Sequence, residues 1–248
     1  MLRVTPAYSA DVLPISPPLH GYRGDDTAVT VCPPRGLTVT ISREAGARGG
    51  RIARRAGQLL GWQVFDQEML GYLVQSESAK AELLTDVPAE ALAWANIEHA
   101  RQLDARHLAD GDQTELLRLA FVLAAKGEVI LVGRGVGELL PTATTVNVRV
   151  IAPLAQRVAY FSQWLRMTPA EAEIEVAARD RVRSALQIAL VGSDPDDLTQ
   201  YDLLLNSGRL GEAECAEMIA HAVRVKQLLP DASDPFLPHL GDTDSEPV

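Results

Sequence analysis

The 248-residue chain has only two cysteines, Cys32 and Cys215, and they do not form a CxxC pair. The sequence therefore gives no support for a disulfide framework or a cysteine-based zinc site. Long apolar runs are also missing, because the longest nearly apolar stretch, residues 121–133, contains Lys126 and Glu128. A membrane-spanning helix needs about 20 apolar residues, so we expect no transmembrane segment and no membrane partner.

Lysine is scarce, since 20 of the 23 basic residues are arginine. Arginine is suited to bidentate recognition of phosphate or carboxylate groups, although a general arginine bias of the composition is the alternative explanation. The net charge is −10, and five of the acidic residues lie in residues 231–248. Residues 37–230 therefore keep only −5 of the net charge, and no nucleic-acid partner is expected.

Aromatic residues make up only 5% of the chain, whereas hydrophobic residues make up 47%. This composition is typical of a soluble globular protein with an aliphatic core. The tryptophans Trp62, Trp94 and Trp164 are interpreted as helix-packing residues. Prolines interrupt the first 18 residues, which do not resemble a signal peptide, so we expect a cytoplasmic protein.

Ten of the 15 prolines fall before residue 37 or after residue 229. Both ends also lack sustained apolar periodicity, which is typical of flexible arms. The sequence therefore predicts a flexible proline-rich arm over 1–36, one folded domain over 37–230 and an acidic flexible tail over 231–248.

Within the expected domain, short β-branched runs alternate with amphipathic helical patterns. The expected strands are 37–41, 64–65, 128–132, 146–151 and 202–206. The expected helices are about 51–60, 154–166, 169–190 and 212–229, with a helical insertion over 67–126 that is broken near 86–88 and 110–112. This order predicts an α/β fold with a parallel sheet of about five strands, helices on both faces and ligands at the carboxyl ends of the strands.

A glycine-containing loop follows the first expected strand and leads into a helix. Glycines let backbone N–H groups turn inward around an anion, and the helix adds its positive N-terminal end. The loop has neither the lysine nor the hydroxyl of a Walker A motif, so its charge would come from nearby arginines. The alternative is a tight turn beside a basic helix face. The candidate phosphate-binding residues are Ser42, Arg43, Gly46, Ala47, Arg48, Gly49, Gly50 and Arg51.

Several motifs occur in a fixed order along the chain: VTISREAGARGGRIARRAGQLLG, FDQEML, VILVGRG, VRVIAPLAQRV, RDRVR and YDLLLNSGRLGEAECAEMI. With these motifs the chain resembles the cytidylate kinase-like proteins, a divergent branch of the P-loop nucleoside monophosphate kinases, over about residues 37–225. The resemblance implies a three-layer P-loop NTPase-type fold. It also implies Mg²⁺ with ATP as cofactor and donor, and a nucleoside monophosphate as acceptor.

The resemblance also implies roles for individual residues. Arg134 matches the arginine that holds the acceptor nucleotide, and Asp66 matches an aspartate close to the phosphates that could hold a magnesium-bound water. Asp66 could equally cap the helix that starts at Gln67. The RDRVR motif matches the lid, where Arg179 and Asp180 are expected at the acceptor. The expected catalytic residues are Arg51, Asp66 and Arg183.

The sequence leaves three functions open. The first is transfer of a phosphoryl group from ATP to a nucleoside monophosphate, with CMP or dCMP expected. The second is a non-catalytic protein whose altered loop binds a nucleotide or another anion. The third is a related kinase with a different small acceptor, because the insertion at 67–126 shapes the acceptor pocket. The oligomeric state is not predicted.

Overall fold

The computed structural model describes residues 34, 36–106, 111–133 and 135–229, except for the side chain of Asp112. The two expected arms lie outside these residues, apart from positions 34 and 36. Arg134, the expected acceptor-binding arginine, also lies outside them. Within the described ranges, no helix combines the length and apolar character needed to cross a membrane.

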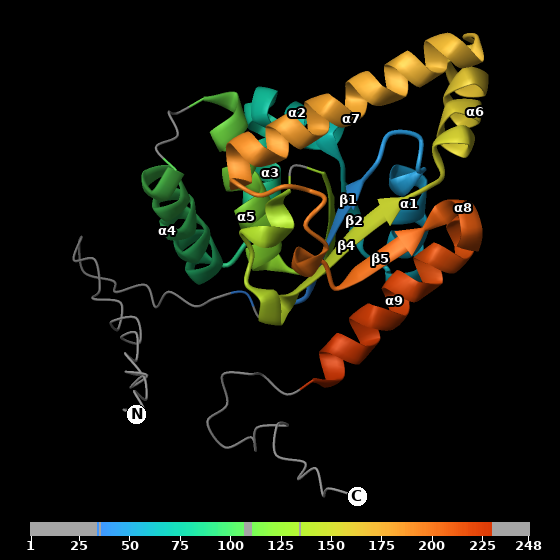
Figure 1. Cartoon of the computed structure of the whole chain (residues 1–248). Coiled ribbons are helices and arrows are strands. Elements are labelled where there is room, and N and C mark those ends of the chain that lie inside the picture. The colour runs from blue at the N-terminus through green and yellow to red at the C-terminus, as the bar shows by residue number, and fades with distance from the viewer. Residues whose placement is uncertain (1–33, 35, 107–110, 134, 230–248) are drawn as a thin grey trace, which may run out of the picture. The chain divides into compact units, whose positions relative to one another are not determined.

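A five-stranded parallel sheet forms the centre of the domain (Figure 1). Its order is β2-β3-β1-β4-β5, and every neighbouring pair is parallel. The bounds are β1 Thr38–Arg43, β2 Gln63–Phe65, β3 Val129–Val132, β4 Thr145–Ile151 and β5 Leu203–Asn206. All five expected strands are confirmed, with ends that differ by one or two residues.

Helices cover both faces of the sheet, as expected. On one face, α1 (Gly49–Leu60) and α9 (Glu212–Leu228) pack on alternate residues of the central strands, among them Val39 and Val148. On the other face, the sheet packs against α5 (Asp112–Lys126), whose residue Phe121 is fully buried. The three layers of the predicted α/β fold are therefore confirmed.

The helical insertion comprises α2 (Gln67–Gln75), α3 (Glu77–Thr85), α4 (Ala89–Arg106) and α5. The expected break near 86–88 is confirmed, and α5 begins beside the expected break at 110–112. A further break at Ser76 was not expected. Its hydroxyl accepts a hydrogen bond from Ala79 N at 3.4 Å, which caps α3 directly after the end of α2.

Two helices that follow β4 form a hairpin, which we call the lid region because the family resemblance places the lid there. The chain leaves the sheet along α6 (Leu154–Leu165) and returns along the long helix α7 (Pro169–Val191), as Figure 1 shows. The turn between them contains Arg166 at φ 55° and a capping box in which Thr168 and Glu171 satisfy each other's backbone N–H groups. Both helices were predicted from the sequence.

The face of the sheet under α7 is polar where β1 meets β4. Thr40 Oγ1 donates a hydrogen bond of 2.8 Å to Asn147 Oδ1, and Arg149 on β4 is also buried. Gly137 covers this strip closely, because a Cβ there would lie 2.4 Å from Thr40 Oγ1. A polar floor therefore reaches the carboxyl edge of the sheet.

Phe121→Ala should lower the free energy of unfolding by about 3–5 kcal/mol, because it empties a fully buried site. It also removes the edge-to-face contact with Trp94, whose ring centroid lies 6.0 Å away. Urea unfolding followed by circular dichroism measures the change. Ile97→Ala, at an exposed position of α4, is the control and should stay within about 0.5 kcal/mol. Equal losses in both variants would contradict this account of the core.

Candidate functional site

The loop between β1 and α1 forms a tight cradle at the carboxyl edge of the sheet. Gly46 has φ +80°, and a Cβ there would lie 2.8 Å from the carbonyl oxygen of Arg157, so the position requires glycine. Gly49 has no room for a side chain either, because a Cβ there would lie 2.8 Å from the Cβ of Arg43. Gly50 has open space within 4 Å. The lack of a side chain at Gly50 leaves the start of α1 accessible.

The buried guanidinium of Arg157, on α6, holds this loop in shape. It donates to Ala45 O at 3.2 Å and to Ala152 O at 3.1 Å, and it forms ion pairs with Asp180 at 2.5 Å and Glu44 at 3.3 Å. Asp180 Oδ1 also accepts a hydrogen bond of 2.6 Å from Ala45 N. Residues of two other segments, α6 and α7, therefore fix the loop.

Ser207, at the start of the short helix α8 (Ser207–Leu210), supports the loop from the other side. Its hydroxyl lies 2.8 Å from Ala47 O and 3.2 Å from Ile151 O, and the residue is buried. Ala47 is itself buried, so it contributes backbone and no side chain to the loop surface.

Two arginines that were expected to replace the missing lysine form ion pairs with Glu212 at the start of α9. Arg48 Nη1 lies 3.3 Å and Arg51 Nε 3.0 Å from the carboxylate oxygens. The side chain of Arg51 is 58% exposed, which places it at the rim of the loop. The structure therefore shows partly neutralised charges at both positions.

Arg183 on α7 is the most enclosed of the expected catalytic residues. Its Nη1 donates a hydrogen bond of 3.4 Å to Arg43 O. Burial lowers the pKa of Arg183, and the charges of Arg179 and Arg149 act in the same direction, whereas Asp180 opposes them. Arginine stays protonated at neutral pH even when burial lowers its pKa, so the group is a cation. Arg183 therefore offers a partly buried positive charge beside one carboxylate and two other guanidinium groups.

Two cavities meet at this arginine. The larger, the loop groove, has a volume of about 700 Å³, and the smaller, the edge pocket, about 220 Å³. Both are lined by Arg43, Glu44, Gln67 and Arg183. The expected residues on the loop groove are Arg43, Gly46, Arg48, Gly49, Gly50, Arg51, Asp66, Arg179 and Arg183. Those on the edge pocket are Ser42, Arg43, Asp180 and Arg183.

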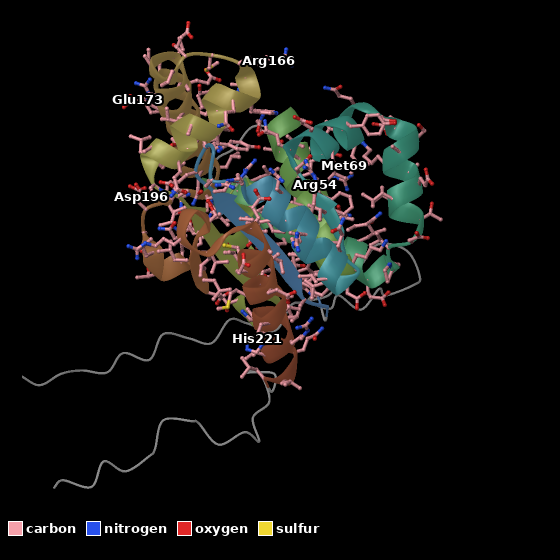
Figure 2. The ribbon with its side chains drawn as sticks, turned by 90° about the vertical axis from the view of Figure 1, so that its right-hand side faces the viewer. Arg54, Met69, Arg166, Glu173, Asp196 and His221 are labelled. Atoms are coloured by element: carbon pink, nitrogen blue, oxygen red, sulfur yellow. The ribbon has the colours of Figure 1, made fainter. Side chains whose placement is uncertain are left out.

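Arg149 is a site residue that the sequence interpretation missed. It lies on β4, is 8% exposed and lines the edge pocket. Its guanidinium donates to Ser42 Oγ at 2.9 Å and to Asp196 Oδ1 at 3.2 Å. The Asp196 side chain is 84% exposed, and Figure 2 labels it. A charged residue within a buried strand was the signal that could have revealed this position.

Asp66 caps α2, since its Oδ1 accepts a hydrogen bond of 3.1 Å from Met69 N. Its other oxygen lies 3.6 Å from Arg54 Nη2, and the side chain lines the loop groove. Figure 2 marks Arg54 and Met69 on the two helices beside it. Mg²⁺ bound to a nucleotide takes most of its ligands from phosphates and water, so one carboxylate on the groove fits such an ion.

The parallel sheet and the loop at its carboxyl edge define the class, a P-loop NTPase-type α/β protein. A sequence model of the cytidylate kinase-like family matches residues 38–209. The chain belongs to the cytidylate kinase-like family. This confirms the resemblance inferred from the motifs. Among curated proteins, none matches the chain in sequence.

Solved structures resemble the chain at low sequence identity. An uncharacterized protein from Eubacterium ventriosum aligns with a TM-score of 0.54 and 14% identity, over 76% of this chain and 98% of that one. TT1252 from Thermus thermophilus has a TM-score of 0.46 and 17% identity, over 79% and 99%. Shikimate kinase from Acinetobacter baumannii in complex with shikimate has a TM-score of 0.40 and 10% identity, and the alignment covers 79% of this chain and 97% of that one. At 14% identity, the first likeness concerns the fold alone.

Arg157→Met should lower the free energy of unfolding by about 3–5 kcal/mol, because it removes one partner from a buried ion-pair network. Glu44 and Asp180 then lose their shared cation, and two backbone carbonyls lose a donor. Urea unfolding measures the loss. Arg224→Met, on the exposed surface of α9, is the matched control and should change stability by less than about 0.5 kcal/mol. If Arg157→Met unfolded at the same urea concentration as the wild-type protein, the loop would be held by other contacts.

Proposed function

We propose that this protein transfers the γ-phosphoryl group of ATP to a nucleoside monophosphate, with CMP or dCMP as the expected acceptor. The observation that carries the proposal is the position of Arg183, which lines both the loop groove and the edge pocket. Phosphoryl transfer needs a donor and an acceptor in line, with positive charge between them. Membership of the cytidylate kinase-like family supports the same reaction class.

The loop groove suits the donor phosphates. The N-terminus of the 12-residue helix α1 opens onto it at Gly49 and Gly50, where unpaired backbone N–H groups and the helix dipole attract anions. Because Arg157 already fixes the preceding loop, little reorganisation is needed when phosphates bind. Arg179, expected at the acceptor, lines this groove, so we assign it to the donor side.

Charge neutralisation at the transferring group falls to arginines, because the loop has no lysine. Arg183 and Arg43 lie where the two cavities meet, whereas Arg51 lies at the rim. We therefore propose Arg183 as the main transition-state cation and Arg51 as a secondary one. Mg²⁺, when bound with ATP, would shield phosphate charge, and Asp66 would hold one of its waters.

The edge pocket suits the acceptor phosphate. Arg183 supplies charge there, Arg149 supplies a guanidinium that also pairs with the exposed carboxylate of Asp196, and Ser42 supplies a hydroxyl. The Asp180 carboxylate is already bonded to Ala45 N and Arg157, so in this pocket it mainly orients the loop. Arg134 remains a proposed acceptor ligand on the basis of the family resemblance.

A second candidate is a non-catalytic nucleotide-binding protein. The Glu212 carboxylate pairs with both Arg48 and Arg51, which reduces the charge available to a transferring phosphate. In such a protein the loop groove would bind ATP, and no acceptor would stimulate its turnover.

The direct test is ADP formation from Mg²⁺-ATP with a panel of nucleoside monophosphates and small hydroxy acids. We expect stimulation by a pyrimidine monophosphate above the rate with ATP alone. Stimulation by a hydroxy acid instead would keep the kinase class and change the acceptor. ATP binding measured by calorimetry, without stimulation by any acceptor, would favour the non-catalytic protein.

Arg183→Met should lower kcat by roughly 10²- to 10³-fold, because a fixed cation at the transferring group acts mainly in the transition state. Arg149→Met should instead raise the KM for the acceptor by roughly 10- to 150-fold, the cost of a charge-assisted contact, while the KM for ATP stays unchanged. Steady-state kinetics with each substrate varied separates the two effects, and Arg224→Met is the control. If Arg149→Met raised both KM values equally, the edge pocket would not be the acceptor site.

A further inference from the structure

Trp164 is unusually exposed for a tryptophan. It lies in the last turn of α6 with 60% of its surface accessible, although aromatic rings usually bury most of their area. Phe161 belongs to a small core cluster with Ala172 and Val176. The rings of Phe161 and Trp164 are in edge-to-face contact, with centroids 5.9 Å apart. Trp164 therefore packs on Tyr160 and Phe161, as expected of a helix-packing residue, but more than half of its surface stays exposed.

Trp164 and Tyr160 form a stacked aromatic pair on α6. Their rings are nearly parallel, at 18°, with centroids 6.3 Å apart. Both residues line the loop groove, together with Gly46, Gly49 and Gly50 of the phosphate loop. The guanidinium of Arg48 lies over the Tyr160 ring, 5.8 Å from its centroid. The aromatic pair therefore lies directly beside the loop, with Arg48 of the loop in contact with Tyr160.

Along α6, the contact with the cationic loop comes first and the aromatic pair comes after it. The helix leaves the carboxyl end of β4 (Figure 1). Arg157 in its first turns donates a hydrogen bond to the loop at Ala45 O. Four residues of helix rise about 6 Å, so Trp164 lies about that much farther along the helix than Tyr160. A ligand that fits this order has a polyphosphate at one end and a flat aromatic group at the other. A nucleoside triphosphate has this arrangement, with the ribose between the two.

We propose that Trp164, supported by Tyr160, binds the base of the donor nucleotide by stacking. The inference rests on the proposed function, because it places the base in the groove assigned to ATP. Stacking on an aromatic side chain contributes to nucleotide binding without any hydrogen-bond readout, since every base has a π face. A purine has a larger face than a pyrimidine, so ATP suits this surface as donor.

Calorimetry on the full chain with Mg²⁺-ATP and with Mg²⁺-tripolyphosphate tests the proposal, because the second ligand has phosphates and no base. Trp164→Ala should weaken ATP binding by about 5- to 150-fold, the range of one base–aromatic contact. Tripolyphosphate binding should not change. Trp164→Phe should recover part of the ATP affinity. Ile174→Ala is the matched control: this apolar residue of α7 is 70% exposed and does not line the groove.

Each other result has a definite meaning. Unchanged ATP binding by Trp164→Ala would overturn the base-binding role. Equal weakening of ATP and tripolyphosphate would also overturn it, because Trp164 would then support the shape of the lid. If the wild-type protein bound neither ligand, the proposed kinase function itself would fail, and the base-binding role with it.

Discussion

The buried guanidinium of Arg157 connects three segments of the chain that meet only in the folded state: the loop after β1, the start of α6 and the middle of α7. Burying an ion pair adds little stability by itself, but it strongly penalises any arrangement that separates the partners. The network thus fixes the phosphate loop and attaches the lid to it at Asp180.

The same arrangement explains why the site is rich in arginine and free of lysine. Arg183 is held under α7 within reach of Arg43 O, among the charges of Arg149 and Arg179. The nearby carboxylates of Glu44 and Asp180 already serve Arg157 and the loop backbone. Arg149 also pairs with Asp196, and Arg179 with Glu175, so guanidinium and carboxylate groups alternate where the loop groove meets the edge pocket.

Much of the fold could be predicted from the sequence because local patterns determine it. The five strands are short β-branched runs, and the lid helices show clear starts, such as the capping box at Thr168. The break at Ser76 escaped prediction because a serine within a continuous helical pattern resembles any other surface position. Its capping role becomes visible only when α3 is known to start there.

The site could be predicted only in part. The loop glycines at 46–50 and the RD motif at 179–180 can be recognised from the sequence, because each lies within one short segment. Arg157 and its partner Ala45 are 112 residues apart, so no local pattern reveals the bond between them. Arg149 could have been found from its charge in a buried strand. Its partners Ser42 and Asp196 depend on the strand pairing and on the loop after α7. The exposure of Trp164 likewise depends on how α6 packs.

The central claim is that the preformed loop and Arg183 together bind the phosphates of a donor nucleotide. A crystal structure of the protein with Mg²⁺ and a non-hydrolysable ATP analogue tests it most directly. The account predicts the β- and γ-phosphates against the backbone N–H groups of Gly49 and Gly50, with Arg183 at the γ-phosphate and the Arg157 network intact. Phosphates bound elsewhere, or a loop that releases Arg157 on binding, would contradict it.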